Sequence, residues 1–256
     1  MVGNIRHVRQ LVDRMRALEH RVHDDMAARR EEFPGGVAYF NDELRSVWDL
    51  NFVRLDRACP SPALEADRLQ AGLGHRKVVI EEPRLVARFG PGLRERGYGE
   101  TELVALARTP GGALDPDVRA MPGPQIEELL RQVTTEQLVP RDPAVVEQLV
   151  RKSLLMEERA GGRWLALFDG DRPVAHCVLF SHEGLVQIED VATLVAWQRR
   201  GFSRRLLDHA LELVRGEHDA VFIQAEANDW PVGFYERLGF VPVERRASYV
   251  LIVAQA

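Results

Sequence analysis

The sequence predicts an α/β fold of the α+β type, in which helices flank a mixed β-sheet. Apolar residues recur at helical spacing in some segments of the 256 residues and in short strand-like runs in others. A strand at GLVQIEDVATL, a helix and a strand at AVFIQAEA follow one another, and a crossover of this length implies a parallel strand pair. The run RWLALFDGDRPVAHCVLF reads as two strands joined at Asp169-Gly170-Asp171, a hairpin signal that adds an antiparallel pair.

The first half of the chain opens with one long amphipathic helix. Over residues 5–32, apolar side chains recur at helical spacing with charges on the other face, and Pro34-Gly35-Gly36 ends the pattern. The elements expected next are strands at GGVAYF and SVWDLNFV, a helix near 62–71, a strand at RKVVI, a helix near 82–96 and a strand at YGETELVALA.

The second half follows a stretch rich in proline and glycine. Residues 109–125 hold four Pro and three Gly but few large apolar residues, which is typical of a linker. Helices at IEELLRQVTTEQL and PAVVEQLVRKSLLMEERA come next, and beyond the hairpin and the strand GLVQIEDVATL lie a helix near 201–215, the strand AVFIQAEA, a helix at WPVGFYERL and a strand at ASYVLIVA. We therefore expect an N-terminal α/β domain at 1–108, a linker at 109–123 and a second domain at 124–256.

The two halves of the chain end alike. LRERGYGETELVALA and YERLGFVPVERRASYVLIVA each hold a helix stopped by glycine, then an aromatic residue and a β-rich tail. The match favours an internal duplication, with two tandem domains of related fold. Chance is the alternative, because glycine after a helix is common.

Composition and charge exclude several classes of protein. A formal net charge of -5 argues against a general nucleic-acid binder, and no apolar run is long enough for a membrane span or a signal peptide. Cys59 and Cys177 form no metal or disulfide pattern, so we expect a cytoplasmic protein. Nearly every basic residue is arginine, so a single arginine carries little information.

The stretch QRRGFSRRLL places one glycine among arginines at the junction of a strand and a helix. A helix start exposes unpaired N–H groups and the positive end of the dipole, which favours a phosphate. Gly201 lets the backbone approach a ligand closely, and Ser203 is small enough not to block it. Flanking arginines add charge-assisted hydrogen bonds. The alternative is a plain left-handed turn with surface arginines.

Two segments in this half resemble the GNAT acetyltransferase superfamily. Its coenzyme A loop reads Arg/Gln-x-x-Gly-x-Gly/Ala after the fourth strand; Gln198 and Gly201 match it, and Ser203 stands where the family has Gly or Ala. Asn228, Tyr235 and Leu238-Gly239-Phe240 match the family's later strand and helix at the usual spacing. The resemblance covers residues 124–256 and extends only loosely to the first half.

The resemblance implies a GNAT-like fold and an acetyl-CoA site. It places Val191, Ala192 and Thr193 where the fourth strand separates from the fifth and its backbone binds the pantetheine arm. It assigns the pyrophosphate to the residues around the glycine, namely Arg199, Arg200, Gly201, Phe202, Ser203 and Arg204. Asn228 would hold the cofactor near its reactive end.

The resemblance also implies an acid and a base. Tyr235 takes the position from which the family protonates the departing thiolate; a packed aromatic side chain is the alternative. Glu189 is the leading candidate for the base, ahead of Asp190 and Glu226, and water is a further option. Alternation along the strand implies that one residue of the pair 189–190 faces solvent.

Other chemistry-bearing residues have simpler explanations. His20 and His23 share a helix face but have no third ligand nearby, so no metal site is expected. His176 and Cys177 read as a buried pair in a strand rather than a nucleophile. In the first half, the segment 69–74 is nearest to the anion loop but leads into a strand, and Leu93 stands where the second half has Tyr235. The first half is therefore either a degenerate copy with a structural role or an unrelated small α/β domain.

Two functions follow from these residues. The leading one is an N-acetyltransferase that uses acetyl-CoA and a primary amine on a small molecule or peptide, with no metal, nucleic acid or membrane partner. The alternative is a non-catalytic sensor or interaction module that binds acyl-CoA. Retention of the loop, Asn228 and Tyr235 together favours the enzyme. The acceptor is not readable from the sequence, because fold does not name it.

Overall fold

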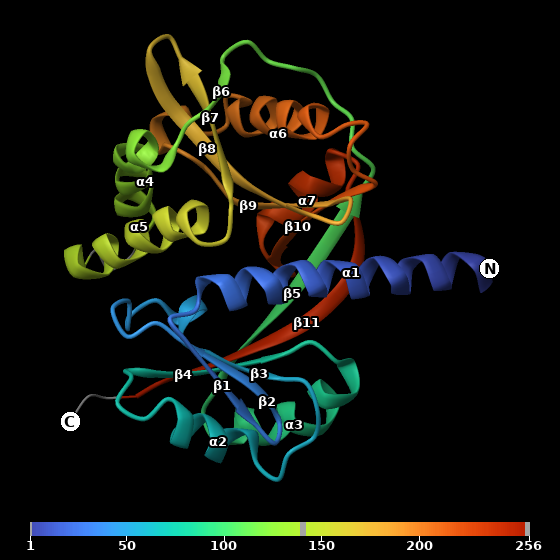
Figure 1. Ribbon diagram of the computed structural model, residues 1–256, viewed down its shortest axis with the longest axis vertical. Coiled ribbons are helices and arrows are strands. Elements are labelled where there is room, and N and C mark those ends of the chain that lie inside the picture. The colour runs from blue at the N-terminus through green and yellow to red at the C-terminus, as the bar shows by residue number, and fades with distance from the viewer. Residues whose placement is uncertain (1, 139–141, 254–256) are drawn as a thin grey trace. The chain divides into compact units, whose positions relative to one another are not determined.

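The computed structural model describes residues 2–138 and 142–253 (Figure 1). It contains two compact units, each described by itself below. Unit 1 comprises Met1–Met26, Leu106–Ile223 and Tyr235–Val241, and unit 2 comprises Ala27–Ala105, Gln224–Phe234 and Pro242–Ala256. The units are thus interleaved along the chain, whereas the sequence suggested two continuous ranges. The first helix belongs with the second half, and most of the last strand belongs with the first.

Unit 1 is built on the strand order β6-β7-β8-β9-β10. Its strands are β6 (Val118–Ala120), β7 (Arg163–Asp169), β8 (Arg172–His182), β9 (Leu185–Thr193) and β10 (Ala220–Glu226), the last with its first four residues in this unit. Neighbours from β6 to β9 pair antiparallel, and β9 pairs with β10 in parallel. The predicted hairpin and the predicted parallel pair are both confirmed.

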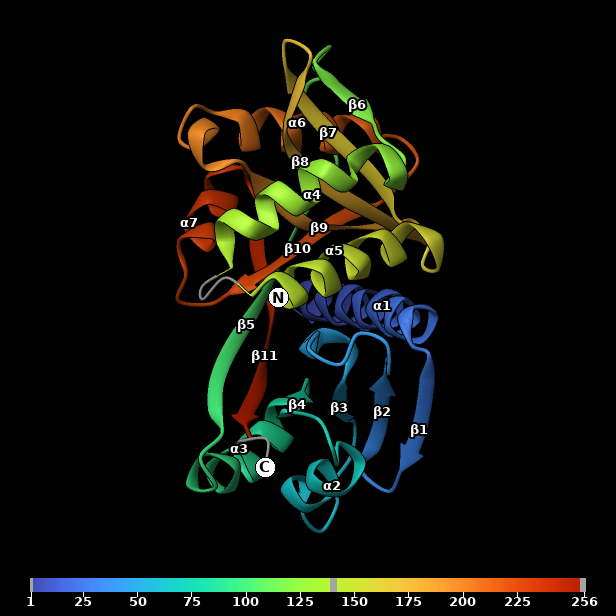
Figure 2. The ribbon, with the colours of Figure 1, turned by 90° about the vertical axis from the view of Figure 1, so that its left-hand side faces the viewer.

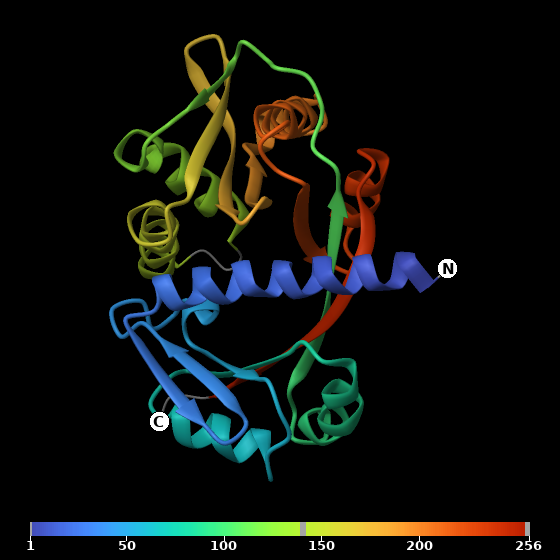
Figure 3. The ribbon, with the colours of Figure 1, turned by 45° about the vertical axis from the view of Figure 1, so that its right-hand side comes forward.

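Helices cover both faces of these strands. α4 (Gly123–Gln137) and α5 (Pro143–Glu158) lie on one face, and α6 (Phe202–Leu213) lies on the other (Figure 3). α1 (Val2–Met26) also belongs to this unit, where its Arg14 bonds Asp219 at 3.0 Å. The apolar stripe of α6 is buried as its spacing predicts, with Phe202, Leu206, Leu207, Ala210 and Leu211 all in the core.

The proline- and glycine-rich stretch is bound along α6. The N–H of Gly111 donates to the carbonyl of Leu211 at 3.1 Å, and that of Ala113 donates to the carbonyl of Asp208 at 3.3 Å. Arg205 of α6 pairs with Asp115 at 2.7 Å, and this pair holds the pKa of the Asp115 carboxyl below its usual value. Val118–Ala120 then joins the sheet as β6. The stretch expected as a linker therefore packs on unit 1.

Gly112 is required where this stretch crosses α6. A Cβ there would overlap the Asp208 carbonyl oxygen. Because backbone on both sides must move, we expect Gly112→Ala to lower the free energy of unfolding by about 1–3 kcal/mol. Gly92→Ala is the control, because Gly92 lies inside a helix with no atom within 4 Å of a Cβ; it should stabilise by about 0.5–1 kcal/mol. Denaturant unfolding measures both, and equal effects would contradict the close approach.

Unit 2 has the strand order β1-β2-β3-β4-β11-β5 (Figure 2). Its elements are β1 (Arg29–Phe33), β2 (Gly36–Phe40), η1 (Trp48–Leu50), β3 (Phe52–Leu55), α2 (Pro62–Leu69), β4 (His75–Ile80), α3 (Pro83–Glu95), β5 (Gly99–Arg108) and β11 (Val241–Ile252), with the ends of β5 and β11 assigned to unit 1. β3 and β4 pair in parallel, whereas β1–β2, β2–β3 and β4–β11 pair antiparallel. A core of aromatic and aliphatic side chains, including Phe33, Phe40 and Tyr249, joins α2 to the strands.

The helical prediction for residues 5–32 is wrong at its C-terminal end. α1 stops at Met26, and Arg29–Phe33 form β1, which pairs with β2 across the turn at Pro34 and Gly35. The backbone hydrogen bonds of this hairpin replace a last helical turn that would carry only charged side chains. Likewise, the strand expected at SVWDLNFV is confined to Phe52–Leu55, because η1 occupies Trp48–Leu50.

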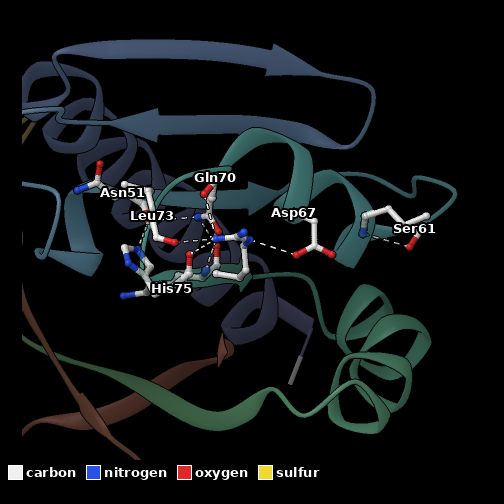
Figure 4. A network of polar contacts seen from close by, with 9 residues as sticks. Asn51, Ser61, Asp67, Gln70, Leu73 and His75 are labelled. Atoms are coloured by element: carbon white, nitrogen blue, oxygen red, sulfur yellow. Dashed lines mark hydrogen bonds and ion pairs between the residues drawn. The ribbon is translucent and has the colours of Figure 1, made fainter. Parts of the chain in front are cut away.

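A polar network fills the turn from α2 into β4 (Figure 4). Arg76 donates to the backbone carbonyls of Gln70, Leu73 and His75 at 2.9–3.1 Å and to the Asp67 carboxylate at 3.1 Å. The Gln70 amide in turn bonds the backbone of Lys77. The segment 69–74, nearest in sequence to the anion loop, thus leads into a strand as expected, and its carbonyls are occupied by a side chain of the protein.

Candidate active site in unit 1

The glycine of the predicted anion loop adopts the left-handed conformation. Gly201 has φ 87° and directly precedes α6, where no side chain caps the helix start. A Cβ at this position would meet no atom within 4 Å. Since the first N–H groups of a helix have no acceptor inside it, this end of α6 presents donors beside an open glycine. The geometry is suited to an anion.

The four arginines of the loop differ in what they bind. Arg205 forms ion pairs with Asp115 and with Asp117, the latter at 2.6 Å. Its charge therefore binds the proline-rich stretch to α6. Arg200 lies 4.0 Å from Asp169, and Arg204 lies 3.6 Å from Asp208. Arg199, at φ 58°, has no polar partner among the described residues. Three exposed guanidinium groups therefore remain near the glycine.

β9 and β10 stop pairing before either strand ends, and β9 then runs on to the loop while still paired with β8. The pairs between β9 and β10 run from Leu185–Ala220 to Ile188–Ile223, and β9 continues to Thr193. The Thr193 hydroxyl lies 2.9 Å from that of Ser203, and Gln198 Nε2 donates to the Thr193 carbonyl at 3.1 Å. These bonds join the end of β9 to the loop. Val191, Ala192 and Thr193 thus lie beside the anion loop.

A β-bulge interrupts the pairing of β8 with β9, which the sequence did not reveal. His176 pairs with Ala192 but Val178 pairs with Glu189, so two residues of β9 stand opposite Cys177 alone. One of them, Asp190, has φ 53°. A bulge leaves an extra residue unpaired and redirects its side chain. Asp190 therefore departs from the simple alternation of a strand, and both Glu189 and Asp190 are half-buried.

The two predicted catalytic residues lie within electrostatic reach of each other. Tyr235 is 7% exposed, and burial raises the pKa of its phenol, with a further contribution from the Glu189 carboxylate. Glu189 accepts a hydrogen bond from Gln187 Nε2 at 2.5 Å. The phenol is therefore protonated at neutral pH and feels the charge of a carboxylate on β9, just beyond the last residue that pairs with β10.

The remaining candidate residues either lie in unit 2 or are buried without a catalytic role. Asn228 belongs to unit 2, as does Glu226, the third candidate base, so their roles stay predictions. Cys177 is fully buried, and burial raises the pKa of its thiol, which disfavours a nucleophile. Among residues 2–138 and 142–253, no group of three or more His, Cys, Asp or Glu side chains could hold a metal ion.

A cavity of about 230 Å³ lies between α4, α5 and the bulge. Its wall includes Ser153, His176 and Asp190, and the Ser153 hydroxyl donates to Asp190 Oδ2 at 3.3 Å. Sequence reasoning missed this cavity, because its residues come from four elements and no motif joins them. Only the adjacent acidic pair at 189–190 and the strand histidine gave a local signal.

Comparisons with known proteins identify the family of this region. Residues 124–240 match the model of the Acetyltransferase (GNAT) family. These residues therefore form a GNAT acetyltransferase domain. No curated protein has a significant match to the chain. Within the described part of the chain, no helix has both the length and the hydropathy that a membrane crossing requires.

Solved structures share the fold of the chain at low identity. A functionally unknown conserved protein from Staphylococcus epidermidis ATCC 12228 has a TM-score of 0.68 at 13% identity, covering 88% of this chain and 93% of that chain. A GCN5-related N-acetyltransferase from Kribbella flavida has a TM-score of 0.59 at 16% identity, covering 95% and 94%. A tandem GNAT protein from the clavulanic acid biosynthesis pathway has a TM-score of 0.54 at 12% identity, covering 79% and 75%. The predicted fold class, a mixed sheet flanked by helices with GNAT-like topology, is confirmed.

Proposed function

We propose that the protein is an N-acetyltransferase that moves an acetyl group from acetyl-CoA to a primary amine of a small-molecule or peptide acceptor. One observation carries the proposal. Unit 1 contains an open left-handed glycine at the start of α6, the end of β9 that no longer pairs with β10, and a protonated Tyr235 within electrostatic reach of Glu189. The match of residues 124–240 to the GNAT family model supports the same class of reaction.

The residues around the loop fit a donor that carries phosphates. The start of α6 offers backbone N–H groups, and the guanidinium groups around Gly201 offer charge-assisted hydrogen bonds. We assign the diphosphate to Arg199, Arg200, Gly201, Phe202, Ser203 and Arg204, and the pantetheine arm to the backbone of Val191, Ala192 and Thr193. We assign Asn228 to the reactive end on the resemblance alone.

The chemistry needs two proton movements. Acetyl-CoA supplies the acetyl group as a thioester. The acceptor nitrogen must lose a proton before its lone pair can attack, and the departing thiolate must gain one. Tyr235 keeps its proton on Oη because burial and the Glu189 charge raise its pKa, so it can donate that proton to the sulfur. Glu189 accepts the proton of the amine, directly or through water.

We assign unit 2 a structural role. β3 ends at Leu55, where its pairing with β4 also ends, so no free strand end follows as it does in β9. In the first turn of α2, Pro62 has no N–H, and the Ser61 hydroxyl accepts from the N–H of Leu64 at 3.4 Å. That helix start offers fewer free donors than the start of α6.

Both cysteines are buried and free, which agrees with a cytoplasmic location.

Binding and turnover measured separately test the proposed function. Calorimetry should detect binding of acetyl-CoA, and an assay of free thiol should show release that depends on an added primary amine. Binding without amine-dependent release would favour the non-catalytic acyl-CoA sensor instead. Absence of acetyl-CoA binding would contradict both.

A further inference from the structure

The cavity beside the bulge combines an apolar wall with polar side chains. It lies between α4 and α5 on one side and β8 and β9 on the other, with a volume of about 230 Å³. Val133, Leu138 and Leu149 supply the apolar part. The polar part comprises Thr134, Gln137, Lys152, Ser153, His176 and Asp190. Ligand pockets typically measure about 300–1,000 Å³, so this cavity suits a small molecule or one end of a larger one.

His176 is the most unusual group in the wall. Its side chain is 1% exposed, its ring approaches the backbone of Asp190, and at least one ring nitrogen has no hydrogen-bond partner among the described residues. Burial lowers the pKa of His176 more than the neighbouring Asp190 raises it, so the ring is neutral and one nitrogen is an acceptor. Buried polar groups are nearly always paired in folded proteins. The orphaned imidazole therefore indicates that this cavity receives a polar group.

Asp190 adds a negative charge next to this imidazole. The bulge gives it a left-handed backbone at φ 53°, and the Ser153 hydroxyl donates to one of its carboxylate oxygens at 3.3 Å. Val191, Ala192 and Thr193, assigned above to the acyl donor, directly follow it in β9. The cavity and the backbone assigned to the acyl donor therefore lie on the same strand, one residue apart.

We propose that this cavity binds the acceptor and that the acceptor is a short aliphatic primary monoamine. This inference rests on the proposed function, because an amine bound here is the acceptor only if the protein transfers an acetyl group. An ammonium group has three N–H donors, and the Asp190 carboxylate, a His176 ring nitrogen and the Ser153 oxygen are acceptors in the wall. The alkyl chain packs on Val133, Leu138 and Leu149. Lys152 also lines the cavity; Asp190 offsets its repulsion of one ammonium group, and the lining has no second carboxylate to offset the repulsion of another.

Direct binding of three probes tests the chemistry of the cavity. Calorimetry on the full chain without acetyl-CoA compares butylamine, butan-1-ol and 1,4-diaminobutane. We expect butylamine to bind most tightly, because butan-1-ol lacks the charge and 1,4-diaminobutane carries a second one. Equal or tighter binding of either comparison probe would overturn the assignment to a monoamine.

Matched variants test the residues. Asp190→Asn should weaken butylamine binding about 10- to 100-fold, because it removes a hydrogen bond to a charged group. Asp171→Asn is the control, since Asp171 lies in the exposed turn between β7 and β8 and loses the same charge. Unchanged affinity in Asp190→Asn, or an equal loss in both variants, would contradict the site.

A second readout covers the case in which Asp190→Asn does not fold. Imidazole NMR signals of the wild-type protein should show a buried neutral histidine that shifts on titration with butylamine and not with butan-1-ol. The absence of such a shift would overturn the inference.

The outcomes for this inference and for the proposed function can be told apart. If butylamine binds but acetyl-CoA does not, the assignment of the cavity to an amine is supported and the proposed function fails. If acetyl-CoA turns over with another class of amine while butylamine neither binds nor reacts, the proposed function stands and this inference fails.

Discussion

Tyr235→Phe is expected to lower the turnover number about 10²- to 10⁴-fold, the usual contribution of general acid catalysis, while acetyl-CoA still binds normally. The substitution keeps the ring, which packs against Phe240 with centroids 6.0 Å apart, and removes only the hydroxyl. Because burial and Glu189 both raise the pKa of Tyr235, the phenol does not ionise in the working range of pH. The loss should therefore persist across neutral and mildly alkaline pH.

Tyr98→Phe provides the matched control for this experiment. Tyr98 is a second buried tyrosine, 4% exposed, in unit 2, and burial raises its pKa to about 12. Its hydroxyl has no hydrogen-bond partner among the described residues, so its removal should leave turnover unchanged. Steady-state kinetics with a saturating amine, together with calorimetry for acetyl-CoA, separates the two effects. Parent-level turnover in Tyr235→Phe would mean that Tyr235 only packs and that solvent or substrate supplies the proton.

Gly201→Val is expected to weaken acetyl-CoA binding about 10- to 100-fold. The added side chain meets no protein atom within 4 Å, so it projects into the space through which a diphosphate would reach the start of α6. Blocking that approach removes hydrogen bonds to a charged group, and each such bond contributes about 1.5–3 kcal/mol. Calorimetry with acetyl-CoA measures the change.

Gly216→Val isolates the effect of the ligand from the effect of the backbone. Gly216 follows the other end of α6 at φ 85°, close to the 87° of Gly201, and its Cβ would also meet nothing within 4 Å. Both variants should lose about 1–3 kcal/mol of stability, because valine is strained at positive φ. Only Gly201→Val should lose affinity. Equal affinities in the two variants would place the diphosphate elsewhere.

Features encoded in neighbouring residues could be predicted from the sequence. α6 and β9 agree with their predicted ranges to within about two residues, because apolar periodicity and a glycine at the junction are local signals. The proximity of Tyr235 and Glu189 followed from the family motif, since 46 residues separate them in the chain and no local rule joins them.

Features that depend on distant partners were missed. The bulge at Asp190 exists because β8 offers only Cys177 opposite two residues of β9, a relation that neither strand encodes alone. β1 replaced a predicted helical turn because β2 pairs with it. β6 was hidden in a stretch whose prolines and glycines read as a linker. In each case tertiary pairing outweighed the local propensity of the segment.

The pairing of β11 with β4 has a consequence for how the protein is synthesised. His75 pairs with Ile252, and Ile80 pairs with Ala247, so β4 lacks its second neighbour until a segment more than 160 residues further along the chain has left the ribosome. Until then its apolar residues Val78 and Ile80 border an unpaired strand edge, which is a template for aggregation. Contacts between such distant segments also form slowly. Unit 2 is therefore completed only after unit 1 has been synthesised up to residue 241, and the edge of β4 is exposed to other chains during that interval.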